Sequence, residues 1–294
     1  MRVTQLMMSQ RFLADLQENM RLLEGKNEQL SNGKRINRPS DDPVGIGQSM
    51  ALRSQVEQSK QYRKNAQNAG SLLDSTEGAL NELSSVLTRA SELGVQGAND
   101  TLSSASRQAL AREVDELFRH TVQVANTDVG GRYIFGGYRT TQRPYTPVGS
   151  FAPVPAYGGD NGAIEYELGA GNKIAVNVTG PDAFADVFGG LTALRDALQA
   201  NDTAAISGAL GTVSAAGDHV LEVRAEVGAR MNRLERTTER LDLLDESLKK
   251  VLSTVEDADM AEVITELKTR ESVYRASLAA GSRLLQPTLM DFLR

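Results

Sequence analysis

The residues that could support covalent or acid–base chemistry are few, and each lies in a pattern typical of a helix or a turn. Residues 47–51 read Gly-Gln-Ser-Met-Ala and resemble the nucleophile elbow of hydrolases if alanine is allowed at the last position. That elbow follows a strand, but here the pair Asp41-Asp42 and then Pro43 precede it, and a helical pattern follows. We therefore interpret Ser49 as a solvent-facing helical serine.

The remaining candidates for catalysis or metal binding are dispersed along the chain. The only histidines, His120 and His219, lie about a hundred residues apart within helical patterns, and there is no cysteine. Disulfides, zinc–thiolate sites and thiol chemistry are thereby excluded. Asp41 and Asp42 are adjacent rather than facing, which favours turn and helix-cap roles over paired-carboxylate catalysis. With no phosphate loop or dinucleotide fingerprint either, the sequence predicts no enzyme, no cofactor and no metal site.

Heptad patterns dominate the chain, beginning with a helix predicted over residues 4–30. Its apolar residues recur every seven positions on two seams. The first seam holds Leu6, Leu13 and Met20, and the second holds Leu16, Leu23 and Leu30. Because such a stripe is narrow, the helix is only marginally stable by itself. It requires partner helices.

Residues 30–47, here called the N-terminal joint, separate this helix from the next. They contain Asn32-Gly33, a predicted helix stop in which Gly33 takes the left-handed conformation, then two prolines and the paired aspartates. A second helical pattern begins after Pro43 and continues to about Glu92, and a third covers residues 110–124. A helical hairpin is therefore predicted after the joint.

A β-rich insert follows the helical hairpin. Between residues 164 and 178 the apolar period becomes two, with a glycine-rich turn at 169–172, which is typical of a β-hairpin. Residues 132–135 are a further predicted strand. Helical patterns resume at 181–198, and a strict seven-residue spacing then runs from Val220 to Val255.

Residues 255–259, here called the C-terminal joint, end that long pattern. Asp259 and Glu262 form a predicted capping box for the last helix. This helix carries apolar residues at heptad spacing, namely Met260, Ile264, Leu267, Tyr274, Leu278 and Leu285. The two terminal helices are predicted to pair side by side, with both joints at one level.

The predicted fold is mostly α, an elongated coiled-coil-like helical rod formed by the N- and C-terminal regions with a small inserted β-rich domain. We predict terminal helical assembly arms at residues 1–43 plus 256–294. The helical rod domain takes residues 44–130 plus 181–255. Residues 131–180 form the inserted β-rich outer domain.

Charge and hydropathy argue against several kinds of partner. The chain has 32 basic and 38 acidic residues, a net charge of −6, which disfavours binding to nucleic acid. No window has the length of a membrane span. Arg11, Asp15 and Glu18 interrupt the first twenty residues, so we expect no cleaved signal peptide. The protein is expected to stay in the cytosol or to leave the cell by a route that reads no such signal.

Both joints carry a family resemblance. L-S-N-G-K-R-I-N at 30–37, followed by S-D-D at 40–42, resembles the N-terminal signature of bacterial flagellins and their junction relatives. V-E-D-A-D-M-A-E at 255–262 resembles that family's entry into its last helix. Within the superfamily, R-P-S-D-D-P at 38–43, Y-I-F-G-G at 133–137 and V-N-V-T-G at 176–180 favour the hook-associated junction proteins over filament flagellins.

This resemblance implies a structural adaptor subunit that is exported unfolded through the flagellar type III apparatus after contact with an export chaperone. It implies an extracellular location in the flagellum, and assembly with copies of itself in a ring between the hook-side junction protein and flagellin. We expect the terminal helices to be weakly ordered in the free subunit and to order when neighbours supply the other seams. The expected assembly interface comprises Leu6, Leu13, Leu16, Met20, Leu23, Leu30, Arg35, Asn37, Asp41, Asp42, Met260, Ile264, Leu267, Tyr274, Leu278 and Leu285.

Three alternatives stay open at this point. A filament-forming flagellin would polymerise by itself into long filaments. An enzyme with a site in the β-rich insert, using Asp160, Glu165 or Asp182, would show hydrolytic activity in the isolated insert. A cytosolic coiled-coil scaffold would not be found outside the cell.

Overall fold

The computed structural model describes residues 5–284, which form a mostly α-helical fold with two small antiparallel sheets. The helices are α1 (Gln5–Asn32), α2 (Pro43–Gly97), α3 (Ser104–Ala125), α4 (Gly180–Ala200), α5 (Thr203–Glu256) and α6 (Met260–Leu284). The strands are β1 (Asp128–Val129), β2 (Arg132–Tyr133), β3 (Glu165–Gly169) and β4 (Asn172–Ala175). The predicted fold class, helices with a small β insert, is confirmed.

The chain forms two compact units. The first comprises residues 1–58 and 244–294 and contains α1, α6, the start of α2 and the end of α5. The second comprises residues 59–243 and contains α3, α4, all four strands and the remaining parts of the two long helices.

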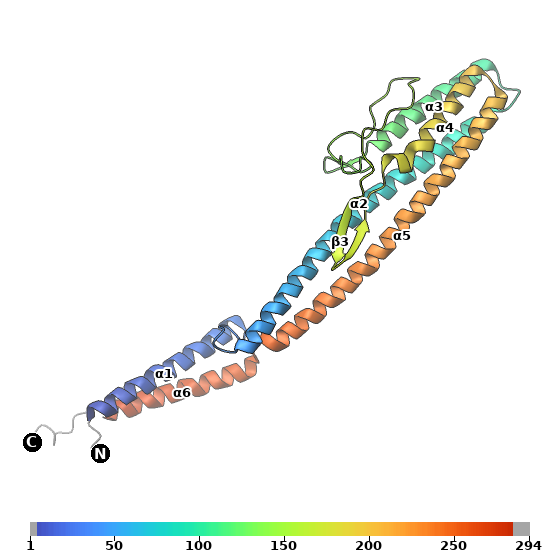
Figure 1. The fold of residues 1–294 in the computed structure, drawn as a ribbon. Helices are drawn as coiled ribbons and strands as arrows, with labels where there is room; N and C mark the ends of the chain where they lie inside the picture. The colour runs from blue at the N-terminus through green and yellow to red at the C-terminus, as the bar shows by residue number, and fades with distance from the viewer. Residues whose placement is uncertain (1–4, 285–294) are drawn as a thin grey trace, which may run out of the picture. The chain divides into compact units, whose positions relative to one another are not determined.

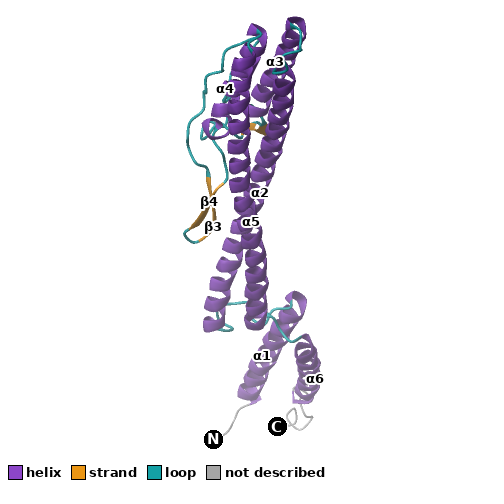
Figure 2. Ribbon diagram, turned by 90° about the vertical axis from the view of Figure 1, so that its right-hand side faces the viewer, coloured by secondary structure: helices purple, strands orange, loops and turns teal. Residues whose placement is uncertain are grey.

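In the second unit, α2 and α5 lie side by side in opposite directions, as Figure 1 and Figure 2 show. The Ser59 hydroxyl donates to the Leu241 carbonyl at 3.5 Å, which aligns one stretch of the pair. Further along, Arg224 of α5 forms an ion pair with Glu77 of α2, with Nη2 2.6 Å from Oε1. Both contacts match an antiparallel register, because the residue number rises along α2 as it falls along α5.

The heptad seams of the long helices form the core of this unit. Leu73, Leu80 and Leu87 of α2 are buried, as are Val220 and Val227 of α5. A group of six aromatic rings extends the core between α3, α4 and the insert: Phe118, Phe135, Tyr145, Tyr157, Phe184 and Phe188. The central leucine seams are therefore intramolecular, as their spacing predicts.

Strands β3 and β4 form the predicted hairpin, and its edges are covered by side chains of the long helices. Ile174 points into the core and is buried. Asn65 of α2 donates to the Glu167 carbonyl at 2.8 Å, and Arg233 of α5 donates to the Lys173 carbonyl at 3.2 Å. An unpaired strand edge is a template for further strands. These bonds therefore disfavour pairing of the hairpin with another strand, and they attach it to both long helices.

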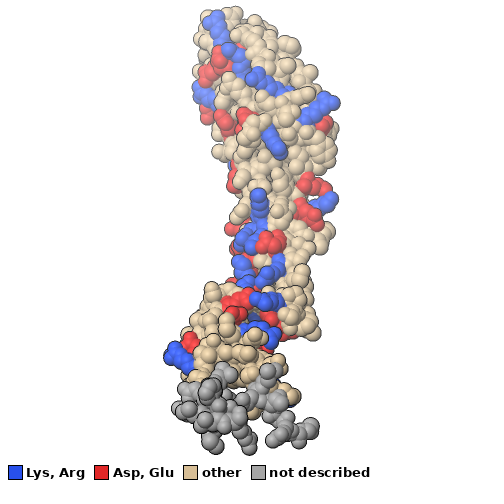
Figure 3. Space-filling view, turned by 90° about the vertical axis from the view of Figure 1, so that its left-hand side faces the viewer, with Lys and Arg blue, Asp and Glu red and all other residues tan. Residues whose placement is uncertain are grey.

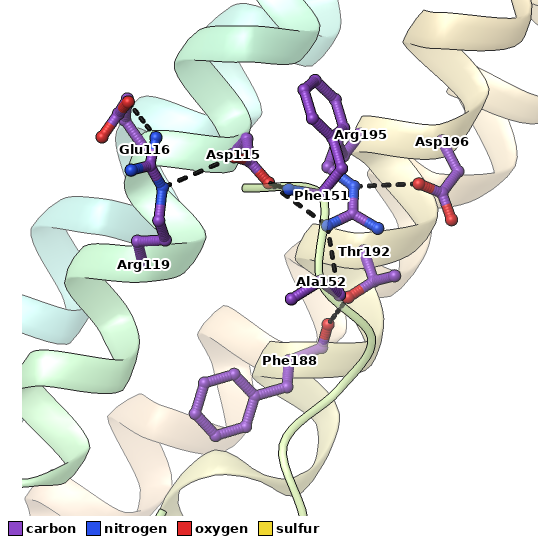
Figure 4. A network of polar contacts seen from close by, with 9 residues as sticks. All are labelled: Asp115, Glu116, Arg119, Phe151, Ala152, Phe188, Thr192, Arg195 and Asp196. Carbon is purple, nitrogen blue, oxygen red and sulfur yellow. Dashed lines mark hydrogen bonds and ion pairs between the residues drawn. The ribbon is translucent and has the colours of Figure 1, made fainter. Parts of the chain in front are cut away.

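A buried ion pair joins α3 to α4 (Figure 4). Asp115 and Arg195 are 1% and 4% exposed, and Arg195 Nη1 lies 3.3 Å from Asp115 Oδ1. The same groups hold the segment between β2 and β3, because Asp115 accepts from the Phe151 amide and Arg195 donates to the Ala152 carbonyl, each at 2.9 Å. The rings of Phe118 and Phe151 lie 5.7 and 5.6 Å from the guanidinium carbon.

Candidate assembly interface

The terminal helices α1 and α6 form an antiparallel pair in the first unit (Figure 1). Phe12 packs against Gly281, where a β-carbon would overlap the phenylalanine ring. Lys26 Nζ lies 2.5 Å from Glu266 Oε2 nearer the joints. Glycine at 281 thus permits the close approach of the two helices. The predicted pairing of the terminal helices is confirmed.

Beyond the helix pair, the N-terminal and C-terminal joints run alongside each other as a short ladder. Gly33, at φ +72°, ends α1, and Lys34 then pairs with Asp257 in an isolated antiparallel bridge. The Arg35 amide donates to the Glu256 carbonyl at 2.7 Å, and the Ala258 amide donates to the Gly33 carbonyl at 2.9 Å. Both joints therefore lie at one level, as the sequence predicts.

Glu256 fixes the ladder to α2 with its side chain. It is 2% exposed, and its carboxylate accepts from Arg53 Nε at 3.0 Å and from Arg53 Nη2 at 2.5 Å, and forms an ion pair with Lys34. Burial by itself raises the pKa of Glu256, but the hydrogen bonds from Arg53 and Lys34 outweigh burial and lower it. This buried carboxylate ties together the N-terminal joint, α2 and the end of α5 within the first unit.

The paired aspartates of the N-terminal joint shape the turn, as predicted. Asp41 Oδ2 accepts from the amides of Asn37 and Arg38, at 3.1 and 2.8 Å. Asp42 caps α2, since its Oδ1 accepts from the Gly45 amide at 2.9 Å. That backbone bond is the largest cause of the lowered pKa of Asp42.

The other two polar residues of the expected interface also make contacts within the subunit. Arg35 Nη2 donates to the Val255 carbonyl at 3.0 Å across the ladder. Asn37 Oδ1 accepts from the Asn32 side chain at 2.6 Å. These bonds order the joint, and contact of the same residues with neighbouring subunits stays a prediction.

The structure divides the apolar residues of the expected interface into two groups. An exposed group keeps much of its side-chain surface uncovered within the described chain: Leu13, Met20, Met260, Ile264 and Leu278. A second group is partly or fully buried: Leu16, Leu23, Leu30, Leu267 and Tyr274. Leu6 lies in α1, and Leu285 lies outside the described residues. The exposed group provides the apolar surface that a partner could cover.

More apolar side chains of the first unit are exposed than the heptad seams include. Val44 and Met50 are both exposed and lie near the start of α2. Their signal in the sequence is weak, because single apolar residues off the seam are normal on a protein surface. The role of Glu256 has no signal in the local sequence either, because its hydrogen-bond partner Arg53 is 203 residues away in the chain.

Ser49 lies in a helix, as expected, but its predicted exposure is wrong. The side chain is 2% exposed, and its hydroxyl donates to the Ile46 carbonyl at 3.0 Å. Ser49 precedes the buried Val56 by one heptad, so it shares the inward face of α2. A serine that is buried and bonded to its own helix has no role as a nucleophile.

The histidines and the acidic residues of the insert hold local structure. His120 Nε2 lies 2.9 Å from Glu82 Oε1 on the surface of α3. Asp160 accepts from the Tyr138 amide at 2.7 Å, the largest cause of its lowered pKa, and Asp182 accepts from the Thr179 hydroxyl at the start of α4. Glu165 pairs with Lys173 across the hairpin. Within residues 5–284 no group of three or more acidic or histidine side chains is placed to hold a metal ion.

The charged surface offers no large area of one sign on the face drawn in Figure 3, where groups of acidic and basic side chains alternate along the chain with uncharged surface between them. Among the described helices, none combines the length and the apolarity needed to cross a membrane. The exposed apolar helix surface of the first unit is therefore the candidate site of contact with other proteins.

The N-terminal and C-terminal parts of the chain each match a region of one known protein family. The bacterial flagellin N-terminal helical region matches residues 3–140, and the bacterial flagellin C-terminal helical region matches residues 210–293. These matches contain α1, α6, both joints and most of α2 and α5.

Individual proteins match over most of the chain. A flagellin of Halalkalibacterium halodurans is 30% identical over 255 residues, which cover 86% of this chain and 84% of that protein. Flagellar hook-associated protein 3 of Escherichia coli is 29% identical over 285 residues, covering 86% and 87%. The crystal structure of Bacillus cereus FlgL has a TM-score of 0.60 at 27% identity and covers 69% of this chain and 99% of that one.

Proposed function

Because this chain belongs to the bacterial flagellin family, we propose that it is a structural subunit of the flagellum and acts as a hook–filament junction adaptor. It joins the hook-side junction protein to the flagellin filament and catalyses no reaction. One observation carries this function: the exposed apolar side chains of the paired terminal helices, which include Leu13, Ile264 and Leu278. Apolar surface of this kind on a soluble chain marks a site of protein contact.

The geometry of the helix pair supports assembly through helices of neighbouring subunits. Two helices side by side can cover only one face of each other, so the remaining apolar positions need further helices. Their heptad spacing suits helix-to-helix packing. In this proposal copies of the chain form a ring, with flagellin on one side and the hook-side junction protein on the other.

The same proposal includes the route out of the cell. The subunit is held by an export chaperone, travels unfolded through the flagellar type III apparatus, and becomes part of the extracellular appendage. A narrow helix pair with few buried contacts is compatible with this route, since little folding free energy opposes unfolding of the arms.

Deletion and complementation of the gene test the proposed function. Cells without the chain should build hooks but release flagellin into the medium, because the filament has no adaptor to which it can attach. Restoring the chain should restore attached filaments. If the deletion strain keeps full-length filaments, the adaptor function is wrong. Assembly of the purified chain alone into long filaments would instead support the alternative, a filament-forming flagellin, which the 30% identical relative keeps open.

Amide hydrogen exchange should show weak protection of the arms in the free subunit. We expect residues 6–30 and 260–284 to exchange much faster than residues 60–97, because the arm helices lack most of their seam partners. After incorporation into flagella, the same arm amides should become protected. Strong protection of both arms in the free subunit would contradict ordering upon assembly.

A charge in the apolar seam should block assembly. Leu278→Asp introduces a carboxylate at an exposed position of α6, so the free subunit should fold normally while incorporation falls at least about tenfold, since a charge would be buried at the contact. Leu23→Asp should have the same effect on incorporation. Leu278→Met, which keeps the apolar surface, is the matched control. Junctions that accept Leu278→Asp as readily as the unaltered chain would show that this seam is not an interface.

A further inference from the structure

Among the described residues, most of the sulfur lies in the first unit, which contains the proposed assembly surface. The sequence holds eight methionines and no cysteine, so methionine supplies all of its sulfur. The structure describes six methionine side chains, because Met1 and Met290 lie outside the described ones. Five of the six are exposed, and all five belong to the first unit. The sixth, Met231 of α5, is partly buried against the core of the second unit.

The exposed methionines lie on the two helices of the terminal pair and near the start of α2. Met7 and Met8 lie near the start of α1, Met20 in its middle, Met50 in α2, and Met260 at the first position of α6, with exposures of 49%, 46%, 49%, 66% and 41%. Met20 also lies at the contact with α6, where the Tyr274 hydroxyl is 4.0 Å from its sulfur. An unbranched thioether adapts to irregular partner surfaces better than a branched side chain does.

We propose that these five methionines make the assembly surface a site of oxidative modification, which is open in the free subunit and closed once neighbours cover it. The reaction with hydrogen peroxide breaks the O–O bond, transfers one oxygen atom to the sulfur and releases water. The thioether is oxidised by two electrons to the sulfoxide, and the peroxide is reduced. This inference rests on the proposed function, because covering of the surface is what closes the site.

Oxidation should change assembly because of the properties of the sulfoxide. It converts a flexible apolar side chain into a polar and chiral one. A sulfoxide oxygen buried in an apolar helix seam without a hydrogen-bond donor is unfavourable. Fold of the free subunit should be unaffected, since the five side chains are exposed and contribute little to the core. The modified subunit is therefore folded but unable to assemble.

Two measurements on the full chain test this inference. First, the purified subunit is treated with hydrogen peroxide, and peptide mass spectrometry follows sulfoxide at each methionine. We expect Met7, Met8, Met20, Met50 and Met260 to react before Met231. In isolated flagella containing the chain, the same five should be protected. Earlier oxidation of Met231, or equal oxidation in free and assembled subunits, would overturn the inference.

Second, binding of the purified subunit is measured on hooks isolated from a strain that lacks it. Peroxide treatment should weaken binding by about tenfold or more, and methionine sulfoxide reductase should restore it. A matched variant with Met7→Leu, Met8→Leu, Met20→Leu, Met50→Leu and Met260→Leu should bind before and after treatment, whereas Met231→Leu should behave as the unaltered chain. Loss of binding by the treated five-leucine variant would overturn the inference. Untreated subunits that fail to bind would overturn the proposed function itself.

Discussion

Replacing Asp115 with alanine is expected to destabilise the second unit by about 3 kcal/mol, because breaking a buried ion pair leaves an uncompensated buried charge. Arg195 is 4% exposed and would lose its buried carboxylate partner, keeping as polar partners the exposed Asp196 carboxylate, 2.9 Å from its Nε, and the Ala152 carbonyl. Urea denaturation followed by tyrosine fluorescence measures the effect, since six of the seven tyrosines lie between residues 59 and 243. The midpoint should fall with little change in slope.

Two comparison variants separate loss of the buried pair from loss of charge alone. Glu116→Ala removes a carboxylate from the next position of α3, but Glu116 is exposed and pairs with Arg119 at the surface, so its midpoint should hardly change. The double variant Asp115→Ala with Arg195→Met should regain part of the stability, because no buried charge is left unpaired. Equal midpoints for Asp115→Ala and Glu116→Ala would show that the buried pair does not stabilise the unit.

Replacing Glu256 with alanine is expected to loosen the ladder between the two joints by about 2 kcal/mol. The carboxylate is buried, but Lys34 and Arg53 are 40% and 51% exposed and can be hydrated after its removal, so the loss is smaller than for a fully buried pair. The amides of Arg35 and Ala258, which donate across the ladder, should exchange roughly thirtyfold faster. Glu266→Ala, which removes an exposed partner of Lys26, is the matched control and should leave these amides unchanged.

The same residue predicts a dependence on pH. The folded pKa of Glu256 is lowered below its ordinary value of 4.5, so its stabilising effect is present above pH 4.5. That effect is lost as the pH falls from 4.5 through the lowered pKa, because the unfolded chain then binds the proton more readily than the folded one. Exchange of the Arg35 and Ala258 amides should show this loss. Glu256→Gln should remove most of it, and an unchanged acid response in that variant would assign the response to another group.

The proposed function explains why the two units differ in what they expose. The second unit contains an extensive core with aromatic rings, and the first unit has a narrow helix pair whose apolar residues are only partly covered. A subunit that must cross an export channel and then bind neighbours benefits from arms that gain their order from contact. The Glu256 ladder aligns those arms at the joints, and in the proposed function neighbouring subunits cover the apolar residues that stay exposed.

Local chemistry made much of the fold predictable from the sequence. Heptad spacing predicts α1, the long helices and α6; Gly33 predicts the end of α1, and alternation between residues 164 and 178 predicts the hairpin. These features depend on neighbours within a few residues in the chain, so the local sequence contains their causes. The resemblance to the flagellin superfamily, based on the joints, is also confirmed, as is the resemblance to its hook-associated junction proteins, which rests in addition on residues 133–137 and 176–180.

The burial of the predicted interface residues, in contrast, depends on contacts between distant parts of the chain. A seam of apolar residues predicts that partners exist, but it does not tell which side chains pack within the subunit. Only the antiparallel pairing of α1 with α6 separates the partly buried Leu23 from the exposed Leu13. The heptad position of Ser49 leads to burial only when a second helix covers that face of α2. For this reason its predicted exposure is wrong.

What the sequence by itself determined was therefore the class of fold, the existence and order of most of its helices and of the β3–β4 hairpin, the two joints and the family. Tertiary structure alone decided the buried charges, because Asp115 and Arg195 are 80 residues apart in the chain and Arg53 and Glu256 are 203 apart. The burial that makes such charges important exists only after the helices have packed. For the same reason only the folded chain shows that its exposed sulfur gathers on one unit, on the surface through which we propose that it assembles.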